Sequence, residues 1–400
     1  MPMSPVSETT HPLKLAERMS RLGTETAFEV LVKARALEAK GKSVIHLEIG
    51  EPDFDTPANI VDSAVDALRK GWTHYGPAAG LPQLREAIAE DVSRSRGVPV
   101  SPEEVVVVPG GKPVMFFVIL ALAQAGDEVI YPNPGFPIYE SMINFSGAKA
   151  VPLRLREEMD FRFDVKELAS LITDRTRLII LNSPHNPTGG VLTGQDIQEI
   201  AQVIGNRNVM ILSDEIYSRL IFDGKHHSIA AVPGFKDRTI ILDGFSKTYA
   251  MTGWRMGFGV MRTDLVPQVS RLVTNATSCT ASFTQVAGVE ALRGDQASVE
   301  KMRLEFLRRR DMFVKGLNQV KGFSCRVPAG AFYTFPNIEK TGWPSKKLAD
   351  ALLDDAGVAA LSGTAFGVSG EGYLRFSIAS SYENLEQALE RIGNWAEKNL

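Results

Sequence analysis

Four groups of residues in this chain have the types and the spacing to bind and react with a small ligand. Each group alone has an ordinary structural explanation, such as a turn, a helix start or a solvated lysine. Each, however, follows a short apolar run that predicts a strand, and the carboxyl ends of parallel strands share one sheet edge, where ligands bind in open α/β folds. The groups are Gly110-Gly111-Lys112 and residues 182–189, 214–217 and 244–247.

The first group, together with Arg255 and Ser246, suits a phosphate. Gly110 and Gly111 precede a predicted helix, so free backbone N–H groups and the helix dipole could bind an anion there. Arg255 would add a bidentate cation, and Ser246 a hydroxyl donor. These residues predict a phosphate site at the sheet edge.

The remaining groups suit a pyridine ring that carries an aldehyde. Asp214 could keep a pyridinium nitrogen protonated, which is typical of pyridoxal phosphate (PLP) sites. Tyr217 and Asn186 could donate hydrogen bonds to a phenolate oxygen, and Lys247 would supply the amine for a Schiff base. An ordinary lysine pKa of about 10.4 keeps this amine charged at neutral pH, so burial and nearby charge such as Arg255 must lower it. We therefore predict PLP as the cofactor.

Alternating strands and helices are expected to position these groups. Apolar, β-branched runs bounded by Gly, Pro, Asn or Asp indicate strands, and helical patterns lie between several of them. Strands that are apolar on both faces indicate a mainly parallel sheet covered by helices, which is an α/β fold. The predicted strands span residues 105–108, 128–131, 178–182, 209–214 and 239–243, with a helix at 194–204.

The pattern changes after Gly294 and predicts a smaller α+β domain. There we expect a charged helix at 297–319, an alternating segment at 324–335, a helix at 346–356, a strand at 373–378 and a helix at 384–398. Residues 1–22 are polar and are expected to form a partly ordered arm. The expected division is residues 1–49 as the arm and part of the small domain, 50–294 as the large PLP-binding domain, and 295–400 as the small C-terminal domain.

The composition argues against several classes of function. A formal net charge of -3 disfavours a nucleic-acid surface, and we expect the arginine run at 308–310 to be a solvated helix face. Cys279 and Cys325 form no disulfide framework, and neither they nor the histidines indicate a metal site. The longest apolar run, residues 114–123, is too short to cross a membrane, and the first residues lack the apolar region of a secretory signal. We expect a cytoplasmic protein.

The sequence resembles the class I aminotransferases of PLP fold type I, specifically the aspartate-aminotransferase-like subgroup. The resemblance runs from about residue 47 to the C-terminus, and so many motifs in order are highly specific. It implies a ping-pong, Schiff-base transfer of the amino group of an L-amino acid to a 2-oxo acid, within amino-acid metabolism, with aspartate or glutamate as candidate substrates. The motifs are residues 47–54 (LEIGEPDF), 75–80 (YGPAAG), 182–189 (NSPHNPTG), 213–217 (SDEIY) and 246–257.

The resemblance also implies roles for single residues. Lys247 resembles the lysine that forms the Schiff base and moves a proton between the substrate Cα and the C4′ atom of the cofactor. Asp214 resembles the partner of the pyridine nitrogen, and Phe136 the aromatic ring stacked on the pyridine. Tyr217 and Asn186 resemble the donors to O3′. The residues on the phosphate side would be Gly111, Lys112, Ser246 and Arg255.

Tyr75 resembles the tyrosine that reaches the phosphate of the neighbouring subunit, which implies a homodimer with shared active sites. Gly50 would line the substrate side, and Arg375 would bind the substrate α-carboxylate. Lys112 stands where the subgroup has a lysine associated with acidic substrates, so recognition of a distal carboxylate and a role beside the phosphate both stay open. Gly244 stands where the family often has a serine, which would remove one hydroxyl donor to the phosphate.

Three other functions share some of these features. C–S lyases, decarboxylases and amino-acid oxidases of the same fold carry the same cofactor motifs, and only their products distinguish them. A regulator built on this fold would need a DNA-binding domain, but no basic helix-turn-helix pattern precedes residue 47. A binding protein with an inactive site is disfavoured because Lys247, Asp214, Tyr217 and Arg255 are all present.

Overall fold

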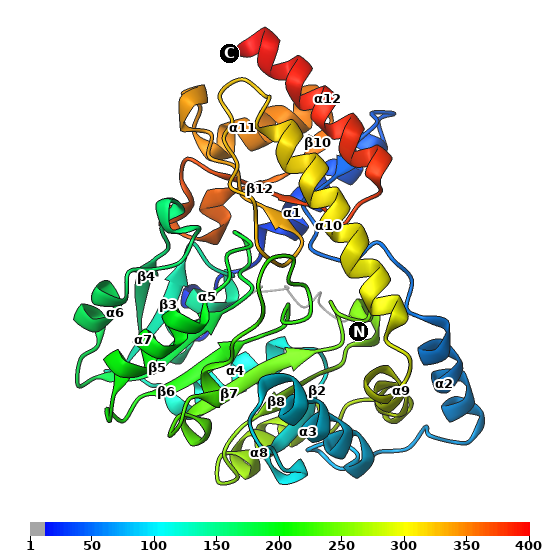
Figure 1. The fold of residues 1–400 in the computed structure, drawn as a ribbon, viewed down its shortest axis with the longest axis vertical. Coiled ribbons are helices and arrows are strands. Elements are labelled where there is room, and N and C mark those ends of the chain that lie inside the picture. Colours follow the sequence, from blue (N-terminus) through cyan, green and yellow to red (C-terminus); the bar gives the residue numbers. More distant parts are fainter. Residues whose placement is uncertain (1–12) are drawn as a thin grey trace, which may run out of the picture.

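The computed structural model describes residues 13–400, and the first twelve residues of the expected N-terminal arm lie outside this range. A larger part is built on a seven-stranded sheet, and a smaller part lies against it (Figure 1). The strands of the sheet, in spatial order, are β2 (Val105–Val108), β8 (Gly257–Val260), β7 (Thr239–Gly244), β6 (Met210–Asp214), β5 (Thr176–Asn182), β3 (Glu128–Asn133) and β4 (Lys149–Arg154).

The predicted mainly parallel sheet is confirmed. Strands β4, β3, β5, β6 and β7 pair in parallel, whereas β8 runs antiparallel to both of its neighbours. The sequence did not indicate β4 or β8. Strand β8 contains two glycines, which weaken a strand signal, and β4 is a half-exposed edge strand that contains Pro152.

Helices cover both faces of the sheet, which explains why the middle of its central strands is apolar on both faces. In β5, Leu178 and Ile180 pack on one face with α4 (Lys112–Leu122) and α5 (Ile138–Ser146). Ile179 and Leu181 pack on the other face with α7 (Gly194–Ile204). Successive side chains of a strand point to opposite faces, so a strand buried on both faces needs apolar residues at every position.

Three more helices cover the face on which α7 packs, at the end of the sheet near β2 and β8. Helices α2 (Ala58–Arg69), α3 (Pro82–Arg96) and α9 (Ser282–Arg293) pack with one another and with β2, β7 and β8. The larger part is completed by α6 (Val165–Leu171) beside α7 and by α8 (Val266–Thr277) beside α4.

The smaller part combines both ends of the described chain. Strand β1 (Ile45–His46) pairs in parallel with β10 (Val358–Ala359). A three-stranded antiparallel sheet has the order β11 (Leu361–Ser362), β12 (Leu374–Ser377), β9 (Tyr333–Thr334). The helices are α1 (Thr26–Glu38), α10 (Ala297–Leu317), α11 (Ser345–Ala351), which continues as a π-helical turn (Leu352–Ala356), and α12 (Tyr382–Asn399).

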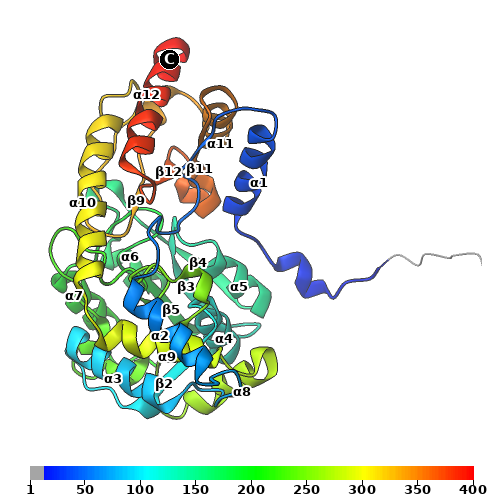
Figure 2. The ribbon, with the colours of Figure 1, turned by 90° about the vertical axis from the view of Figure 1, so that its right-hand side faces the viewer.

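Helix α10 runs from the larger part to the smaller one, and the residues before α1 lie beside α5 (Figures 1 and 2). At this contact, Gly23 N donates to Ser141 Oγ at 2.9 Å. The expected division of the chain at residues 49/50 and 294/295 stays a prediction.

The arginine run at 308–310 is not a solvated face, and that expectation was wrong. Arg308 is exposed, but the side chains of Arg309 and Arg310 are only 6% exposed. Arg309 Nη1 lies 2.7 Å from Asp53 Oδ1, and Arg310 Nη1 donates to the Pro328 carbonyl at 3.0 Å. Consecutive helical residues point in different directions, so two of the three face the body of the protein and find partners there.

Neither a membrane segment nor a metal cluster is found within residues 13–400. No helix there combines the length and the apolar character that a membrane crossing requires. In the same range, no three His, Cys, Asp or Glu side chains are grouped so that they could hold a metal ion.

Candidate active site

A cavity of about 470 Å³ lies at the carboxyl ends of β5, β6 and β7, and residues of the smaller part complete its wall. The sequence predicted this edge because parallel strands end there together. Tyr75 is the predicted site residue that does not line the cavity, and it is 89% exposed. The predicted site residues that do line it are Gly50, Gly111, Lys112, Phe136, Asn186, Asp214, Tyr217, Ser246, Lys247, Arg255 and Arg375.

Lys247 lies just beyond the end of β7, and its amine points at the opposite wall. Its Nζ donates to the Gly50 carbonyl at 2.5 Å. Burial lowers the pKa of Lys247 to about 8, Glu51 opposes this shift, and the cations Arg375 and Lys112 reinforce it. From the sequence, Arg255 was expected to lower this pKa. In the structure Arg375 and Lys112 have this effect instead, since tertiary packing brings them near the amine.

Asp214 ends β6 inside the protein. Tyr139 Oη donates to Asp214 Oδ2 at 2.6 Å, and the Ile216 N–H donates to Oδ1 at 3.3 Å. Burial raises the pKa of Asp214 to about 6, although both hydrogen bonds oppose the shift. Sequence reasoning missed Tyr139. Its position three residues after Phe136 is the signal that could have found it, because the turn that leads into α5 joins the Tyr139 N–H to the Phe136 carbonyl at 3.0 Å and so brings the two residues together.

Arg375 and two tyrosines form the wall on the side of the smaller part. Tyr217 and Tyr333 share a hydrogen bond between their hydroxyls at 2.7 Å, and the Arg375 guanidinium lies 4.5 Å from the centre of the Tyr333 ring. Arg375 Nη1 donates to Asn186 Oδ1 at 3.3 Å, and Nη2 contacts the Glu48 carbonyl. Its buried Nε has no hydrogen-bond partner among residues 13–400. The sequence did not indicate Tyr333.

A tight turn and an arginine form the opposite end of the cavity. Gly110 has a φ of 85°, a left-handed conformation that favours glycine, and any Cβ there would collide with the Arg255 guanidinium. Gly111 then forms the N-cap of α4. Pro113 has no N–H and the Val114 N–H donates to the Gly111 carbonyl at 3.1 Å, so the N–H groups of Gly111 and Lys112 are the ones left at this helix start to bind an anion. A Cβ at Gly244 would lie 3.0 Å from the Cα of Gly257. The close approach of β7 to β8 therefore leaves little room for a serine side chain at this position.

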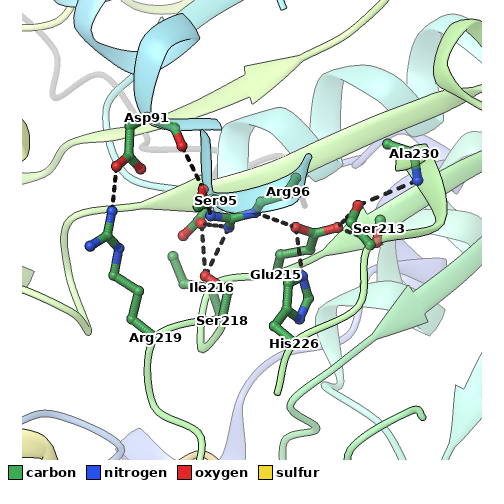
Figure 3. A network of polar contacts seen from close by, with 12 residues as sticks. Asp91, Ser95, Arg96, Ser213, Glu215, Ile216, Ser218, Arg219, His226 and Ala230 are labelled. Carbon is green, nitrogen blue, oxygen red and sulfur yellow. Dashed lines mark hydrogen bonds and ion pairs between the residues drawn. The ribbon is translucent and has the colours of Figure 1, made fainter. Parts of the chain in front are cut away.

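A buried polar network lies behind these strand ends (Figure 3). Arg96, at the end of α3, has a side chain that is 2% exposed; its Nε donates to Glu215 Oε2 at 2.9 Å, and its Nη2 contacts Asp243. Nη2 also donates to Ser218 Oγ at 2.8 Å. His226 Nε2 lies 2.9 Å from Glu215 Oε2. The network thus joins the end of α3 to the ends of β6 and β7.

The charges of this network hold Glu215 in its ionised form. Burial alone would raise the pKa of Glu215, but His226 and Arg96 lower it well below its usual range. The other carboxylate oxygen accepts hydrogen bonds from Ser213 at 3.0 Å and from Ser228 at 2.6 Å. Because Glu215 directly follows Asp214 in the chain, its fixed position also fixes the turn that carries Asp214.

Three comparisons with known proteins agree with one another. Residues 42–392 match the family model for aminotransferases of class I and II. The chain is 42% identical to an aspartate aminotransferase of Pyrococcus abyssi, over 88% of this chain and 91% of that protein. It is 39% identical to aromatic-amino-acid aminotransferase 2 of Thermococcus litoralis, over 95% and 97%. The structure of an aspartate aminotransferase from Thermus thermophilus with maleate has a TM-score of 0.92 at 35% identity, covering 96% of this chain and 99% of that one.

Replacing Arg96 by methionine should destabilise the protein by about 3–5 kcal/mol, because Glu215 and Asp243 would lose their buried partner. The measurement is urea unfolding of the purified protein. Arg94→Met on the same helix is the matched control: its side chain is 71% exposed, so the change should be below about 1 kcal/mol. Equal losses in the two variants would contradict a structural role for the buried network.

Replacing Asp214 by asparagine should stabilise the cofactor-free protein at pH 7 by about 2–3 kcal/mol. An unfolded aspartate ionises near pH 3.9, whereas Asp214 in the folded protein ionises near pH 6. Ionisation therefore lowers the stability of the wild type as pH rises between these values. The gain should be complete above pH 6 and absent below about pH 4, as measured by thermal unfolding across this range.

The control for Asp214→Asn is Asp237→Asn, which changes an exposed aspartate in the same way. A gain in stability that does not depend on pH, or one that the control shares, would mean that burial of the Asp214 carboxylate is not its cause.

Proposed function

Because this chain belongs to the class I and II aminotransferases and is an aminotransferase, we propose that it holds PLP on Lys247 and transfers amino groups at the cavity described above. The observation that carries the proposal is one cavity lined by an amine with a lowered pKa, a buried carboxylate, a helix N-terminus beside an arginine, and a second arginine, one N–H of which has no partner in the described part of the chain. These are the groups that PLP and an amino acid require.

The residues present fit PLP. Arg255, Ser246 and the N-terminus of α4 would hold the phosphate, since each offers hydrogen-bond donors at one end of the cavity. Asp214 would hold the protonated ring nitrogen, and Tyr139 would keep the carboxylate oriented through its 2.6 Å hydrogen bond. When bound, PLP supplies the electron sink that stabilises a carbanion at the substrate Cα.

Further residues would contact the cofactor ring. The Phe136 ring would stack on one face of the pyridine ring, because it lines the cavity. An edge-to-face contact with the Tyr139 ring, whose centre lies 5.7 Å away, holds it in place. Tyr217 and Asn186 would donate to the phenolate oxygen. The hydroxyl of Tyr217 is already oriented by Tyr333, and the side chain of Asn186 by Arg375.

Lys247 would both attach the cofactor and move the proton. A pKa of about 8 leaves a far larger fraction of the amine neutral at pH 7 than an ordinary lysine has, and only the neutral amine is a nucleophile or a base. Once the substrate amine replaces it, Nζ would accept the proton from Cα. The Gly50 carbonyl, at 2.5 Å in the structure, holds Nζ on this side of the cavity.

Arg375 would bind the α-carboxylate of the substrate. A guanidinium is suited to this because it can donate two parallel hydrogen bonds to a carboxylate. It is only 4% exposed, so the interaction would be made away from water and would orient the amino acid strongly. Gly50 would leave room beside it, since any Cβ at that position would overlap the Tyr333 hydroxyl.

One of the two substrates is proposed to be a dicarboxylic amino acid, aspartate or glutamate, with the matching 2-oxo acid. Lys112 supports this because its cationic amine lines the same cavity as Lys247 and Arg375 and could pair with a distal carboxylate. The relatives named above as aspartate aminotransferases agree with an acidic substrate, and the aromatic-amino-acid aminotransferase relative agrees with a second, uncharged one.

The active enzyme is proposed to be a homodimer in which Tyr75 reaches the phosphate in the neighbouring subunit. Tyr75 is 89% exposed on a loop, so its apolar ring lies in water. Burial of this ring against a partner subunit would be favourable. The cytoplasmic location expected from the sequence stays a prediction.

Transfer of an amino group is tested by incubating the PLP-loaded protein with single amino acids: aspartate, glutamate, alanine, phenylalanine and arginine. At least one should yield its 2-oxo acid together with stoichiometric pyridoxamine phosphate, and Lys247→Ala should lower the rate at least about 10²-fold. Chromatography of the products is the measurement. Release of ammonia or peroxide without pyridoxamine phosphate would replace transamination by lyase or oxidase chemistry.

Capture of PLP by the cofactor-free protein should depend on pH through the Lys247 amine. Only the neutral amine attacks the aldehyde, so the rate should rise as pH increases through about 8 and level off above it. Borohydride trapping at fixed PLP concentration from pH 6 to 10 measures this rate, with Lys247→Ala as the blank. A rate that still rises steeply at pH 10 would show an ordinary lysine pKa.

A further inference from the structure

The Lys112 amine is paired with a carboxylate that belongs to the protein itself. Glu25 Oε1 forms an ion pair with Lys112 Nζ, and both residues line the proposed active-site cavity. Glu25 immediately precedes α1 in the smaller part, whereas Lys112 begins α4 under the sheet edge. The Lys112 amine also lies 5.4 Å from the centre of the Phe136 ring. Lys112, which is expected to recognise a substrate carboxylate, is therefore already paired with a carboxylate of the protein.

The ion pair between Glu25 and Lys112 is weak enough for another carboxylate to replace Glu25. Glu25 makes no side-chain hydrogen bond to the start of its own helix, and among residues 13–400 Lys112 is its sole hydrogen-bond or ion-pair partner. The side chain of Lys112 is 48% exposed and that of Glu25 is 17% exposed. A half-exposed ion pair contributes little free energy, so a competing carboxylate could replace Glu25.

The charge of Glu25 also acts on the rest of the cavity. Burial lowers the pKa of both Lys247 and Arg375, and the Glu25 carboxylate opposes each shift. Glu25 is thus close enough to the reacting amine and to the α-carboxylate site to influence which charges a ligand can carry. Ala27 and Phe28 line the same cavity, so the start of α1 forms one wall of the space for a substrate side chain.

In a ping-pong transfer, the space for the substrate side chain must accept two different side chains in turn. Both substrates occupy the same site in turn, so a dicarboxylic amino acid and an uncharged one must each be accepted there. A lysine that recognises the acidic side chain would have no partner beside the uncharged one, and an apolar substrate side chain that displaces water from an unpaired charge is unfavourable. A carboxylate of the protein that can pair with the lysine removes this conflict.

We propose that Glu25 is a specificity-determining residue: it pairs with Lys112 while an uncharged side chain is bound, and the distal carboxylate of an acidic substrate takes its place. The proposal rests on the aminotransferase function proposed above. It assigns Lys112 to side-chain recognition and makes the start of α1 responsible for tolerance of uncharged, including aromatic, substrates. The ligand classes are dicarboxylates in one state and monocarboxylates with an apolar side chain in the other.

The experiment compares Glu25→Gln with the wild type in two readouts. The first is the dissociation constant, by calorimetry, of maleate and of 3-phenylpropionate, neither of which carries an amino group that could react. The second is the ratio of kcat/KM for glutamate to that for phenylalanine. Glu25→Gln should bind maleate about fivefold more tightly, since no internal carboxylate competes, and it should bind 3-phenylpropionate more weakly. The ratio of the two dissociation constants and the ratio of the two kcat/KM values should therefore each shift about tenfold in favour of the dicarboxylate.

Two further variants separate this role from general effects of charge or folding. Glu29→Gln removes the same charge from an exposed position on α1 and should leave both ratios unchanged. Glu25→Asp keeps the carboxylate and should restore most of the tolerance for 3-phenylpropionate. Unchanged ratios in Glu25→Gln, or equal changes in Glu25→Gln and Glu29→Gln, would overturn the proposal.

Failure of the proposed function would look different. If no amino acid gave up its amino group in the wild type, the transaminase proposal would fail, while the two dissociation constants would still decide whether Glu25 competes with a ligand carboxylate for Lys112.

Discussion

A guanidinium buried between two carboxylates fixes the geometry on which the proposed site depends. Arg96 is nearly inaccessible to water, and a charge in that environment is stable only when its partners stay in place. Its partners Glu215 and Asp243 come from the turn after β6 and from the end of β7. Asp214 precedes the first partner by one residue, and Lys247 follows the second by four. The separation of the proposed ring-binding carboxylate from the proposed reactive amine is therefore set by one network behind the cavity.

Within the cavity, burial acts in opposite directions on the acid and on the base. It raises the pKa of Asp214 and lowers that of Lys247, because both charged forms lose hydration. Neither residue is in its most stable environment in the protein alone, whereas a ligand with a ring cation and an aldehyde would satisfy both. Perturbed ionisable groups that converge in one cavity are typical of functional sites, where stability is lower than packing alone would permit.

The proposed recognition of the substrate depends on how the smaller part packs against the sheet. Arg375 lies on β12, next to the strand that carries Tyr333, and Tyr333 in turn bonds to Tyr217 of the larger part. Glu25 reaches the same cavity from the start of α1 and meets Lys112. The groups proposed for the cofactor therefore come mainly from strand ends, whereas those proposed for the substrate come mainly from the smaller part. A change in substrate preference can therefore arise without altering the cofactor site.

The sequence by itself determined the α/β fold, the central parallel strands and the residues expected at their ends, because strand periodicity, strand-ending Gly, Pro and Asn, and ordered motifs are local signals. It did not indicate Tyr139 or Tyr333 as part of the site, nor the antiparallel strand β8 with its two glycines. Only the tertiary structure decided that Lys112 pairs with Glu25, 87 residues earlier, and that Arg96 pairs with Glu215, 119 residues later. Such contacts form when elements that are far apart in the sequence pack together, and no local pattern of residues indicates which elements will meet.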